Sequence, residues 1–257
     1  MQLVDIKDLR VSFRHHDGVV SAVRGVTLGL SKGESLGIVG ESGSGKSVTF
    51  LALMRLLQAP AATIEADKIE LDGSDLLNAD AKALSDIRGS LVSMVFQDPM
   101  TSFDPLFTIG YQISETIQTH GNTGKKAALA QARELLAKVE IKHPDRVLKQ
   151  YPHQLSGGML QRAMIAMALS CETRLLIADE PTTALDVTVQ AQILQLITDL
   201  QQETGMSLII ITHDLGVIAE TVDRVVVMYG GKVMEIGDTL EIFEDPLNPY
   251  TMALIES

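Results

Sequence analysis

Residues 40–48 are Gly40-Glu41-Ser42-Gly43-Ser44-Gly45-Lys46-Ser47-Val48, and they directly follow the apolar stretch Ser35-Leu36-Gly37-Ile38-Val39. This order predicts a strand, a glycine-rich loop and the first turn of a helix. In the spacing G-x-x-x-x-G-K-S, the glycines let successive backbone N–H groups turn inward around phosphate groups. Lys46 can then reach the β- and γ-phosphate oxygens, and the Ser47 hydroxyl can ligate Mg²⁺. The stretch therefore predicts a site for a nucleoside triphosphate.

The composition limits the class of protein. With 257 residues and 46% hydrophobic content, the chain can bury one large α/β core, or a core and a small subdomain. The net charge of -12 argues against a protein that binds the phosphate backbone of nucleic acid. The single cysteine, Cys171, excludes an internal disulfide and indicates a reducing compartment. No apolar run approaches the ~20 residues that cross a bilayer, and the N-terminus does not resemble an export signal.

The pattern along the chain predicts several layers. Residues 3–39 alternate apolar and polar stretches around turn signals, which indicates antiparallel strands. Residues 105–165 have helical periodicity throughout, and this insert predicts a separate helical subdomain. Apolar strands then alternate with helices, which implies a mostly parallel sheet covered on both faces. The expected elements of this last part are strands at 175–179 and 207–212, a helix at 187–204, and a hairpin of strands 224–228 and 232–235.

Two carboxylates end the predicted strand Leu175-Leu176-Ile177-Ala178-Asp179 and open the turn after it. Ligands bind at the carboxyl ends of parallel strands, and a carboxylate such as Asp179 can hold Mg²⁺ there through a water. Glu180 points to the other side and is placed to polarise a water for attack on a γ-phosphate. Asp179 alone could be an ordinary turn residue, so its interpretation depends on the glycine loop.

Gln97, His213 and the segment that begins at Ser156 indicate a function only when they are considered together. Gln97 and His213 each follow a predicted strand, where a solvated glutamine or a hydrogen-bonded histidine is the ordinary expectation. Ser156 is a natural N-cap, and the glycine pair Gly157-Gly158 after it exposes backbone N–H groups. This predicts a second anion-binding helix terminus, although the pair could also belong to an ordinary helical turn.

In this order the motifs resemble the nucleotide-binding subunit of an ATP-binding-cassette (ABC) transporter, and the resemblance covers essentially the whole chain. The family pattern places its signature at Leu155–Met159, which includes Ser156, Gly157, Gly158 and Met159, and its D-loop at 184–186, ending in Asp186. Gln97 matches the Q-loop, Glu180 the catalytic base and His213 the switch histidine. Phe13 matches the aromatic residue that stacks on adenine, although it could equally belong to the core. Gln97 joins Ser47 and Asp179 as an implied Mg²⁺ ligand.

Met159 departs from the glutamine that most often ends the signature. The segments around Phe96, Tyr151 and Ile177 resemble the branch of importers for oligopeptides, dipeptides and nickel, so Met159 is interpreted as a feature of that branch. The end of the chain resembles the start of that branch's C-terminal extension. Because peptide-importing members usually continue further, the chain is either truncated or belongs with the shorter nickel or metal-chelate members.

The resemblance implies a P-loop NTPase fold: a RecA-like core, an N-terminal antiparallel β subdomain and an inserted helical subdomain. It divides a single domain, 1–257, into residues 1–100 and 165–240 for the β subdomain and core, 101–164 for the helical subdomain, and 241–257 for the extension. It implies ATP and Mg²⁺ as cofactors and a head-to-tail dimer with an identical or homologous cassette. Membrane permease subunits, an extracytoplasmic binding protein and a place on the cytoplasmic face of the plasma membrane are also implied.

Other functions remain open at this point. A soluble cassette ATPase acting on nucleic acid or ribosomes normally has two cassettes or characteristic insertions, and the acidic charge disfavours it. A simple P-loop kinase would give the residues from Ser156 to Met159 no function. Export is disfavoured because exporter cassettes are commonly fused to a membrane domain. The cargo does not follow from the sequence.

Overall fold

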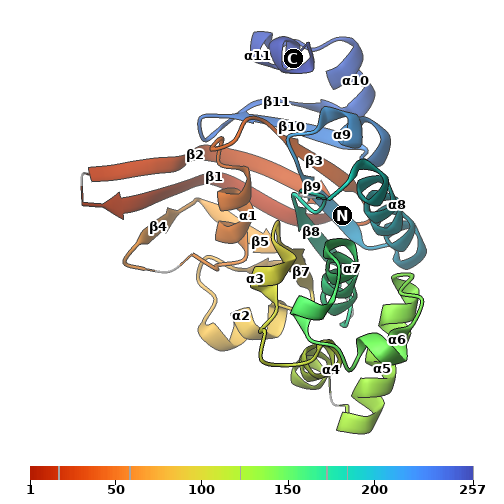
Figure 1. Cartoon of the computed structure of the whole chain (residues 1–257). Helices are drawn as coiled ribbons and strands as arrows, with labels where there is room; N and C mark the ends of the chain where they lie inside the picture. The colour runs from red at the N-terminus through yellow and green to blue at the C-terminus, as the bar shows by residue number, and fades with distance from the viewer. Residues whose placement is uncertain (17, 58, 122, 172, 184, 257) are drawn as a thin grey trace. The chain divides into compact units, whose positions relative to one another are not determined.

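The apolar stretch ahead of the glycine loop forms β3 (Ser35–Val39), in which all five residues are buried. The computed structural model describes residues 1–257 except 17, 58, 122, 172, 184 and 257. It divides into two units: Met1–Leu84 with Ser207–Ser257, and Ser85–Met206 (Figure 1). The helix α2 (Ala81–Ile87) joins the first unit to the second along the chain.

In the first unit, β3 lies between two parallel neighbours, β9 and β10. Leu36 is opposite Ile209 of β9, and Ile38 is opposite Val226 of β10. These strands are continuous apolar runs because both faces of a parallel sheet are covered. A hairpin adds β11 antiparallel to β10, as the sequence predicts. The bounds are β9 (Ser207–Ile211), β10 (Arg224–Tyr229) and β11 (Lys232–Asp238).

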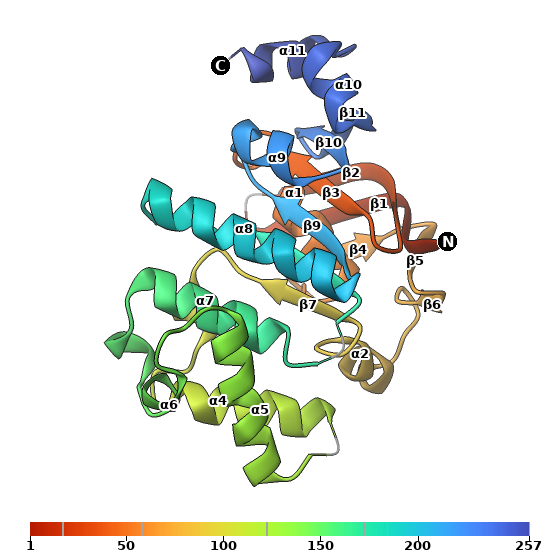
Figure 2. The ribbon, with the colours of Figure 1, turned by 90° about the vertical axis from the view of Figure 1, so that its right-hand side faces the viewer.

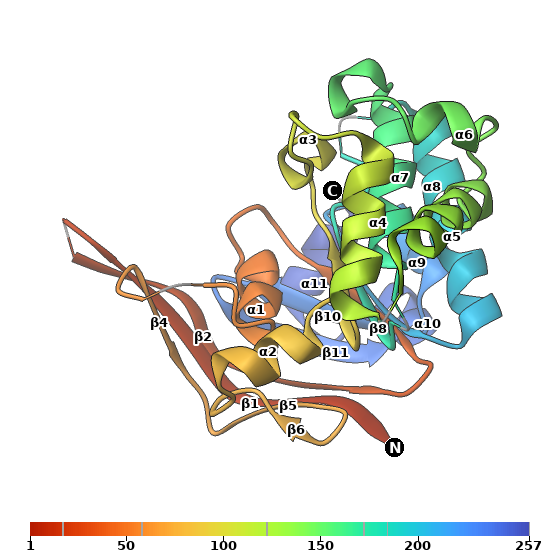
Figure 3. The ribbon, with the colours of Figure 1, turned by 90° about the horizontal axis from the view of Figure 1, so that it is seen from below.

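A second sheet of this unit is antiparallel and confirms the layer expected near the N-terminus. Its long strands β1 and β2 run side by side (Figures 1 and 3). Val4 and Ile6 of β1 are buried, and Leu9 and Val11 are buried after a register shift between Ile6 and Leu9, so each part of the strand alternates as in a sheet with one covered face. The bounds are β1 (Gln2–His15), β2 (Gly18–Ser31), β4 (Ala62–Glu65), β5 (Lys68–Leu71) and β6 (Ser74–Asp75).

The helices of the first unit have capped starts with one exception. The apolar spacing predicts a helix from Val48 to Leu57, but α1 spans Lys46–Leu53. It stops early because Arg55 takes a left-handed backbone conformation, with φ 55°, which ends a right-handed helix. The later helices α9 (Leu215–Thr221), α10 (Thr239–Glu244) and α11 (Pro249–Ile255) follow the N-cap residues Asp214, Asp238 and Asn248.

The second unit contains a parallel strand pair and most of the helices. The pair is β7 (Val92–Val95) and β8 (Leu175–Asp179), and β8 has the bounds that the sequence predicts. Helices α4, α5 and α7 contact one another, and α7 also contacts α8 (Figure 2). The helix bounds are α3 (Pro99–Ser102), α4 (Ile109–His120), α5 (Lys125–Lys138), α6 (Pro144–Val147), η1 (Pro152–Gln154), α7 (Gly157–Ala168) and α8 (Val187–Thr204).

Amphipathic spacing explains the packing of these helices. In α5 the residues Ala128, Ala132 and Leu136 are fully buried at intervals of four, so one stripe of the helix faces its neighbours. The 18-residue α8 buries Ile193 and Ile197 in the same way. Residues 105–165 are thus largely helical, as their periodicity predicts, and they belong to the second unit together with β7, β8 and α8.

Candidate nucleotide-binding and hydrolysis site

The glycine loop connects β3 to α1 and closes on itself. Lys46 is only 5% exposed. Its ammonium donates to the carbonyl oxygens of Gly40, at 2.7 Å, and of Glu41, at 2.9 Å. The amide N–H of Ser44 donates to the Glu41 carbonyl at 3.2 Å. The loop thus holds a buried positive charge at the start of a helix, which is an arrangement suited to a phosphate group.

Two glycines make this loop possible. Gly40 has φ 144°, and a Cβ there would lie 2.0 Å from the carbonyl oxygen of Met228. Gly45 has φ 95°, and a Cβ there would lie 2.6 Å from the carbonyl oxygen of Ala22. Both positions therefore exclude a side chain through backbone conformation and through space. The loop packs against the backbones of β10 and β2, and this packing determines the direction of its backbone N–H groups.

The first helix of the first unit has no side-chain cap. Its N-cap is Gly45 in the left-handed region, so the cap residue offers no side chain to accept the first N–H groups of α1. Ser47 and Val48 occupy the first turn. Such a helix end suits an anionic ligand, because the ligand can accept those N–H groups.

The predicted catalytic residues Gln97 and Glu180 lie together in the second unit. The side-chain N–H of Gln97 donates to Glu180 Oε2 at 2.9 Å, and the Thr183 hydroxyl donates to the same oxygen at 2.9 Å. Glu180 follows β8 and has φ 45°, a strained conformation for a residue with a side chain. Asp179, at the end of β8, is 8% exposed. The strand end thus orients one carboxylate with two donors, and a second carboxylate is buried beside it in sequence.

The predicted signature forms the start of α7. Ser156 is the N-cap, as expected, and its hydroxyl accepts the N–H of Met159 at 3.4 Å. A Cβ on Gly158 would lie 2.8 Å from Val189 Cγ1, so the glycine permits α7 to approach α8 closely. Gly157 is exposed. Its N–H belongs to the first turn of the helix, where backbone donors have no partner within the helix.

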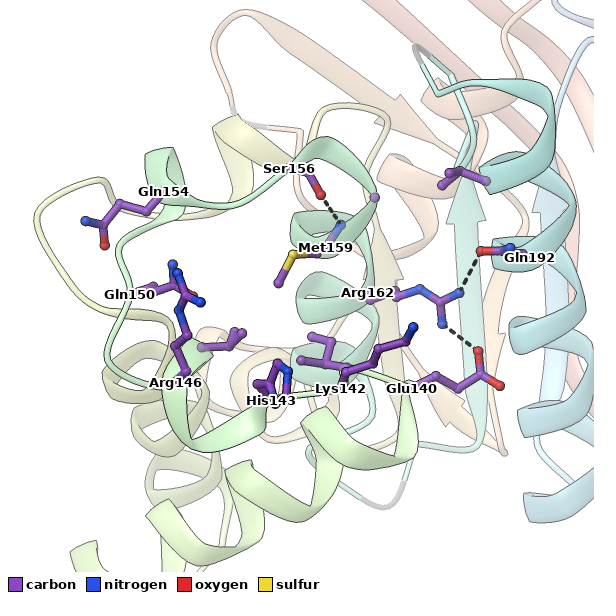
Figure 4. A pocket seen from close by; sticks show the side chains of 14 residues that line it. Glu140, Lys142, His143, Arg146, Gln150, Gln154, Ser156, Met159, Arg162 and Gln192 are labelled. Atoms are coloured by element: carbon purple, nitrogen blue, oxygen red, sulfur yellow. Dashed lines mark hydrogen bonds and ion pairs between the residues drawn. The ribbon is translucent and has the colours of Figure 1, made fainter.

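A cavity of about 960 Å³ opens beside this helix start, within the second unit. Figure 4 shows Met159 on its wall, with Arg146 and Arg162 among the other lining residues. Arg162 donates to Glu140 Oε2 at 2.9 Å, which holds its guanidinium in place. Methionine gives this wall a thioether where glutamine would supply an amide. The departure at Met159 therefore changes the chemistry of the wall and leaves the Ser156 cap intact.

The remaining predicted residues lie on defined elements. His213 is exposed and stands between β9 and the cap of α9. Asp186 is the N-cap of α8 and accepts the Val189 N–H at 3.0 Å. Phe13 is half-buried on β1, opposite Val20. Ala184 of the predicted D-loop lies outside the described residues.

Two further residues, Thr183 and Tyr250, make contacts that the sequence did not indicate. Thr183 donates to Glu180, and Tyr250 of α11 accepts the backbone N–H of Glu41 at 3.3 Å. Thr183 could have been noticed as a hydroxyl three residues after the predicted base. Nothing in the local pattern around Tyr250 points to the glycine loop, because 209 residues separate it from Glu41.

The three predicted metal ligands all have side-chain oxygen atoms. The hydroxyl of Ser47, the amide of Gln97 and the carboxylate of Asp179 offer the hard oxygen atoms that Mg²⁺ prefers. Because the amide nitrogen of Gln97 faces Glu180, its oxygen is turned away from that carboxylate. Among the described residues, no group of three or more His, Cys, Asp or Glu side chains could hold a metal ion. Each of the three side chains, taken by itself, has an oxygen donor that fits Mg²⁺.

Within the described part of the chain, every helix is too short or too polar to cross a membrane.

Comparison with protein families gives one match over most of the chain. The family model described as "ABC transporter" matches residues 23–183. The oligopeptide transport ATP-binding protein OppD of Bacillus subtilis is 51% identical over 256 residues, which is 100% of this chain and 72% of OppD. A probable peptide ABC transporter ATP-binding protein of Sinorhizobium fredii is 50% identical, over 99% of this chain and 76% of its own. The glutathione import protein GsiA of Escherichia coli is 50% identical, over 97% of this chain and 41% of its own.

Solved structures agree with these relatives. A dimeric, post-hydrolysis structure of the ATP-binding cassette MJ0796 with ADP and Pi matches with a TM-score of 0.81 and 27% identity. It covers 92% of this chain and 99% of that one. The cassette cbiO1 from Clostridium perfringens matches with a TM-score of 0.76, over 95% of this chain and 91% of its own. The expected fold class is therefore confirmed.

Proposed function

Because this chain belongs to the ABC transporter family and is an ATP-hydrolysing subunit of it, we propose that it drives the import of peptides through a separate membrane permease. The named relatives act on peptides, oligopeptides and glutathione, which favours peptides over nickel chelates as cargo. These relatives are transporter components, so the alternative of a soluble ATPase acting on nucleic acid or ribosomes is not supported.

One observation carries the proposal of hydrolysis: Glu180 Oε2 accepts from both Gln97 and Thr183 at the carboxyl end of β8. Two donors on one oxygen orient the carboxylate, and in this proposal the carboxylate accepts a proton from the attacking water. Lys46 and the N–H groups of Gly40–Ser47 and Val48 bind the triphosphate, and Phe13 stacks on the base. Ser47, Gln97 and Asp179 would hold Mg²⁺, which would neutralise the phosphate charge.

The assembly follows from the same premise. ABC ATPases work with membrane permeases and dimerise, as the MJ0796 cassette does. In this proposal Ser156, Gly157, Gly158 and Met159 of one cassette cover the nucleotide of its mate. Asp186 also contributes to nucleotide binding, and His213 contacts the γ-phosphate. Residues 101–164 form the helical subdomain that faces the permease. An extracytoplasmic binding protein delivers the cargo, and the cassette lies on the cytoplasmic face of the plasma membrane.

The substitution Glu180→Gln tests the catalytic assignment, because it keeps the shape of the side chain and removes its basicity. We expect ATP turnover to fall about 10²- to 10⁴-fold, the usual contribution of a general base, while ATP binding is retained. Glu134→Gln, an exposed glutamate on α5, is the matched control and should keep the wild-type rate. Near wild-type turnover in Glu180→Gln would refute the assignment.

Cargo is tested separately in the parent organism. Cells that carry only the Glu180→Gln allele should lose uptake of labelled di- and tripeptides and keep uptake of chelated nickel. Loss of nickel uptake with normal peptide uptake would contradict the peptide proposal and leave the ATPase assignment standing.

A further inference from the structure

The C-terminal helix α11 reaches the glycine loop through one tyrosine. The backbone N–H of Glu41 donates to the Tyr250 hydroxyl at 3.3 Å. This contact lies within the first unit and joins residues 209 positions apart. The ring of Tyr250 also packs on Tyr229, with the two ring centroids 4.6 Å apart. Tyr229 is the last residue of β10. It directly follows Met228, whose carbonyl oxygen lies so close to Gly40 that a Cβ there would have no room.

The same peptide group is held from both of its ends. The N–H of Glu41 and the carbonyl of Gly40 belong to one planar peptide unit. Its carbonyl oxygen accepts from the Lys46 ammonium at 2.7 Å, while its N–H donates to Tyr250. A peptide that donates at one end becomes a better acceptor at the other, so the two hydrogen bonds reinforce each other. Tyr250 thereby fixes the direction in which the carbonyl faces Lys46.

Tyr250 itself is held by a built arrangement. Its backbone N–H donates to the Asn248 side chain at 2.9 Å, and the Asn248 amide donates to the carbonyl of Met234 at 3.0 Å. Glu235 of β11 accepts the N–H groups of Leu247, at 2.7 Å, and of Asn248, at 3.1 Å. These contacts tie the start of α11 to β11. The hydroxyl of Tyr250 is therefore placed by the fold and is not a mobile surface group.

The protonation state of Tyr250 is consistent with a hydroxyl that accepts the Glu41 N–H. Burial raises its pKa above the ordinary value of tyrosine, and the nearby charge of Glu41 adds to the shift, while the N–H of Glu41 opposes it. The hydroxyl consequently stays neutral at physiological pH. A neutral hydroxyl can accept the N–H of Glu41 without placing a negative charge beside a phosphate site.

We propose that Tyr250 is a positioning residue for ATP binding, which acts on Lys46 through the Gly40–Glu41 peptide. Without the hydroxyl, the Glu41 N–H loses its acceptor and the peptide can rotate. The Lys46 ammonium then loses a defined carbonyl partner and approaches the triphosphate from a less ordered starting position. This inference rests on the proposed function, because it needs ATP to bind at the glycine loop.

The test is Tyr250→Phe in the full chain, with MgATP as the probe. This change removes the hydroxyl and keeps the ring against Tyr229. We expect the Kd and KM for MgATP to rise about three- to tenfold, the size expected for one lost hydrogen bond. The value of kcat should change less than about twofold, because Glu180 and Gln97 are untouched. Tyr229→Phe is the matched control, and it should leave the Kd and KM at wild-type values.

Hydrogen exchange of the Glu41 amide separates positioning from general stability. In Tyr250→Phe the exchange of this one amide should accelerate, while the thermal unfolding midpoint stays close to that of the wild type. Unchanged Kd with unchanged Glu41 exchange would overturn the inference. An equal rise of Kd in Tyr229→Phe would also overturn it, because the effect would then not be specific to the Tyr250 hydroxyl. Failure of the wild-type chain to bind MgATP would contradict the proposed function instead.

Discussion

The helix starts of α1 and α7 were both expected to bind anions, yet the two are built differently. At α1 the N-cap is Gly45, which has no side chain, and the buried Lys46 adds a positive charge. At α7 the N-cap is Ser156, whose own hydroxyl accepts a backbone N–H through a long contact of 3.4 Å. The first start therefore has no capping side chain on its N-cap residue, whereas the second is capped by Ser156.

The two helix starts illustrate two ways in which a protein can form an anion-binding site. A loop without side-chain caps must be held by its surroundings, and Gly40 and Gly45 touch the backbone of β10 and β2 for that reason. A serine-capped start is stable alone and can exchange a weak internal hydrogen bond for one to a phosphate. We therefore expect α1 to carry most of the binding energy and α7 to respond to nucleotide held elsewhere.

The largest expected effect comes from removing the charge at α1. Lys46→Ala should lower kcat/KM for ATP about 10²- to 10³-fold, because a preorganised charge that faces the phosphates is lost. Lys142→Ala is the control, since Lys142 is an exposed lysine in the cavity beside α7. Steady-state hydrolysis assays of both variants measure the contrast. An equal loss in Lys142→Ala would remove the distinction between the two helix starts.

The next effect concerns the packing that holds the loop at α1. Gly40→Ala should lower the free energy of unfolding by about 3 kcal/mol or more, because its φ is strained and its Cβ would meet the Met228 carbonyl. Gly43→Ala is the matched control in the same loop. A Cβ there meets nothing within 4 Å, so only the cost of φ 78°, about 1–2 kcal/mol, remains. Denaturant titration distinguishes the two, and equal losses would show that space around the loop does not matter.

The smallest effect on stability is expected at α7. Ser156→Ala should lower the free energy of unfolding by less than about 1 kcal/mol, below the typical value for an N-cap, because the cap contact is long. The better placed cap Asp186, at 3.0 Å, supplies the comparison, and Asp186→Ala should cost about 1 kcal/mol. Thermal unfolding of both variants checks the order. A larger loss for Ser156→Ala would mean that its hydroxyl is committed to the helix and is not available to a ligand.

Local sequence was enough for elements that depend on local chemistry. The strands β3 and β8 were predicted with their observed bounds, because continuous apolar runs between turn signals leave little choice. The helix α8 was predicted from its amphipathic spacing, and the Ser156 cap from the preference of serine for the N-cap position. The end of α1 was wrong by four residues, since Arg55 changes its backbone conformation inside a pattern that still looks helical.

The same distinction, between what local sequence determines and what it does not, applies to the residues of the candidate site. Gly40–Ser47, Asp179 and Glu180 could be identified by spacing alone, because each motif is short and its chemistry needs those residue types in that order. The family pattern implied separate roles for Gln97 and Glu180, and only the structure shows that the two side chains are in contact, at 2.9 Å. Thr183 and Tyr250 were missed: the only signal for Thr183 is a hydroxyl three residues after the predicted base, and a tyrosine after a proline carries no signal of its own.

The sequence by itself determined that this chain has a glycine-rich loop between a strand and a helix, a pair of carboxylates at a strand end and a serine-capped helix, because these depend on neighbouring residues and on spacing. Only the tertiary structure decided what surrounds them. Met228 closes on Gly40, Gln97 and Thr183 converge on Glu180, and Tyr250 holds the Gly40–Glu41 peptide opposite Lys46. Such contacts join segments far apart in the chain, and chain connectivity gives no local pattern from which a distant partner could be inferred.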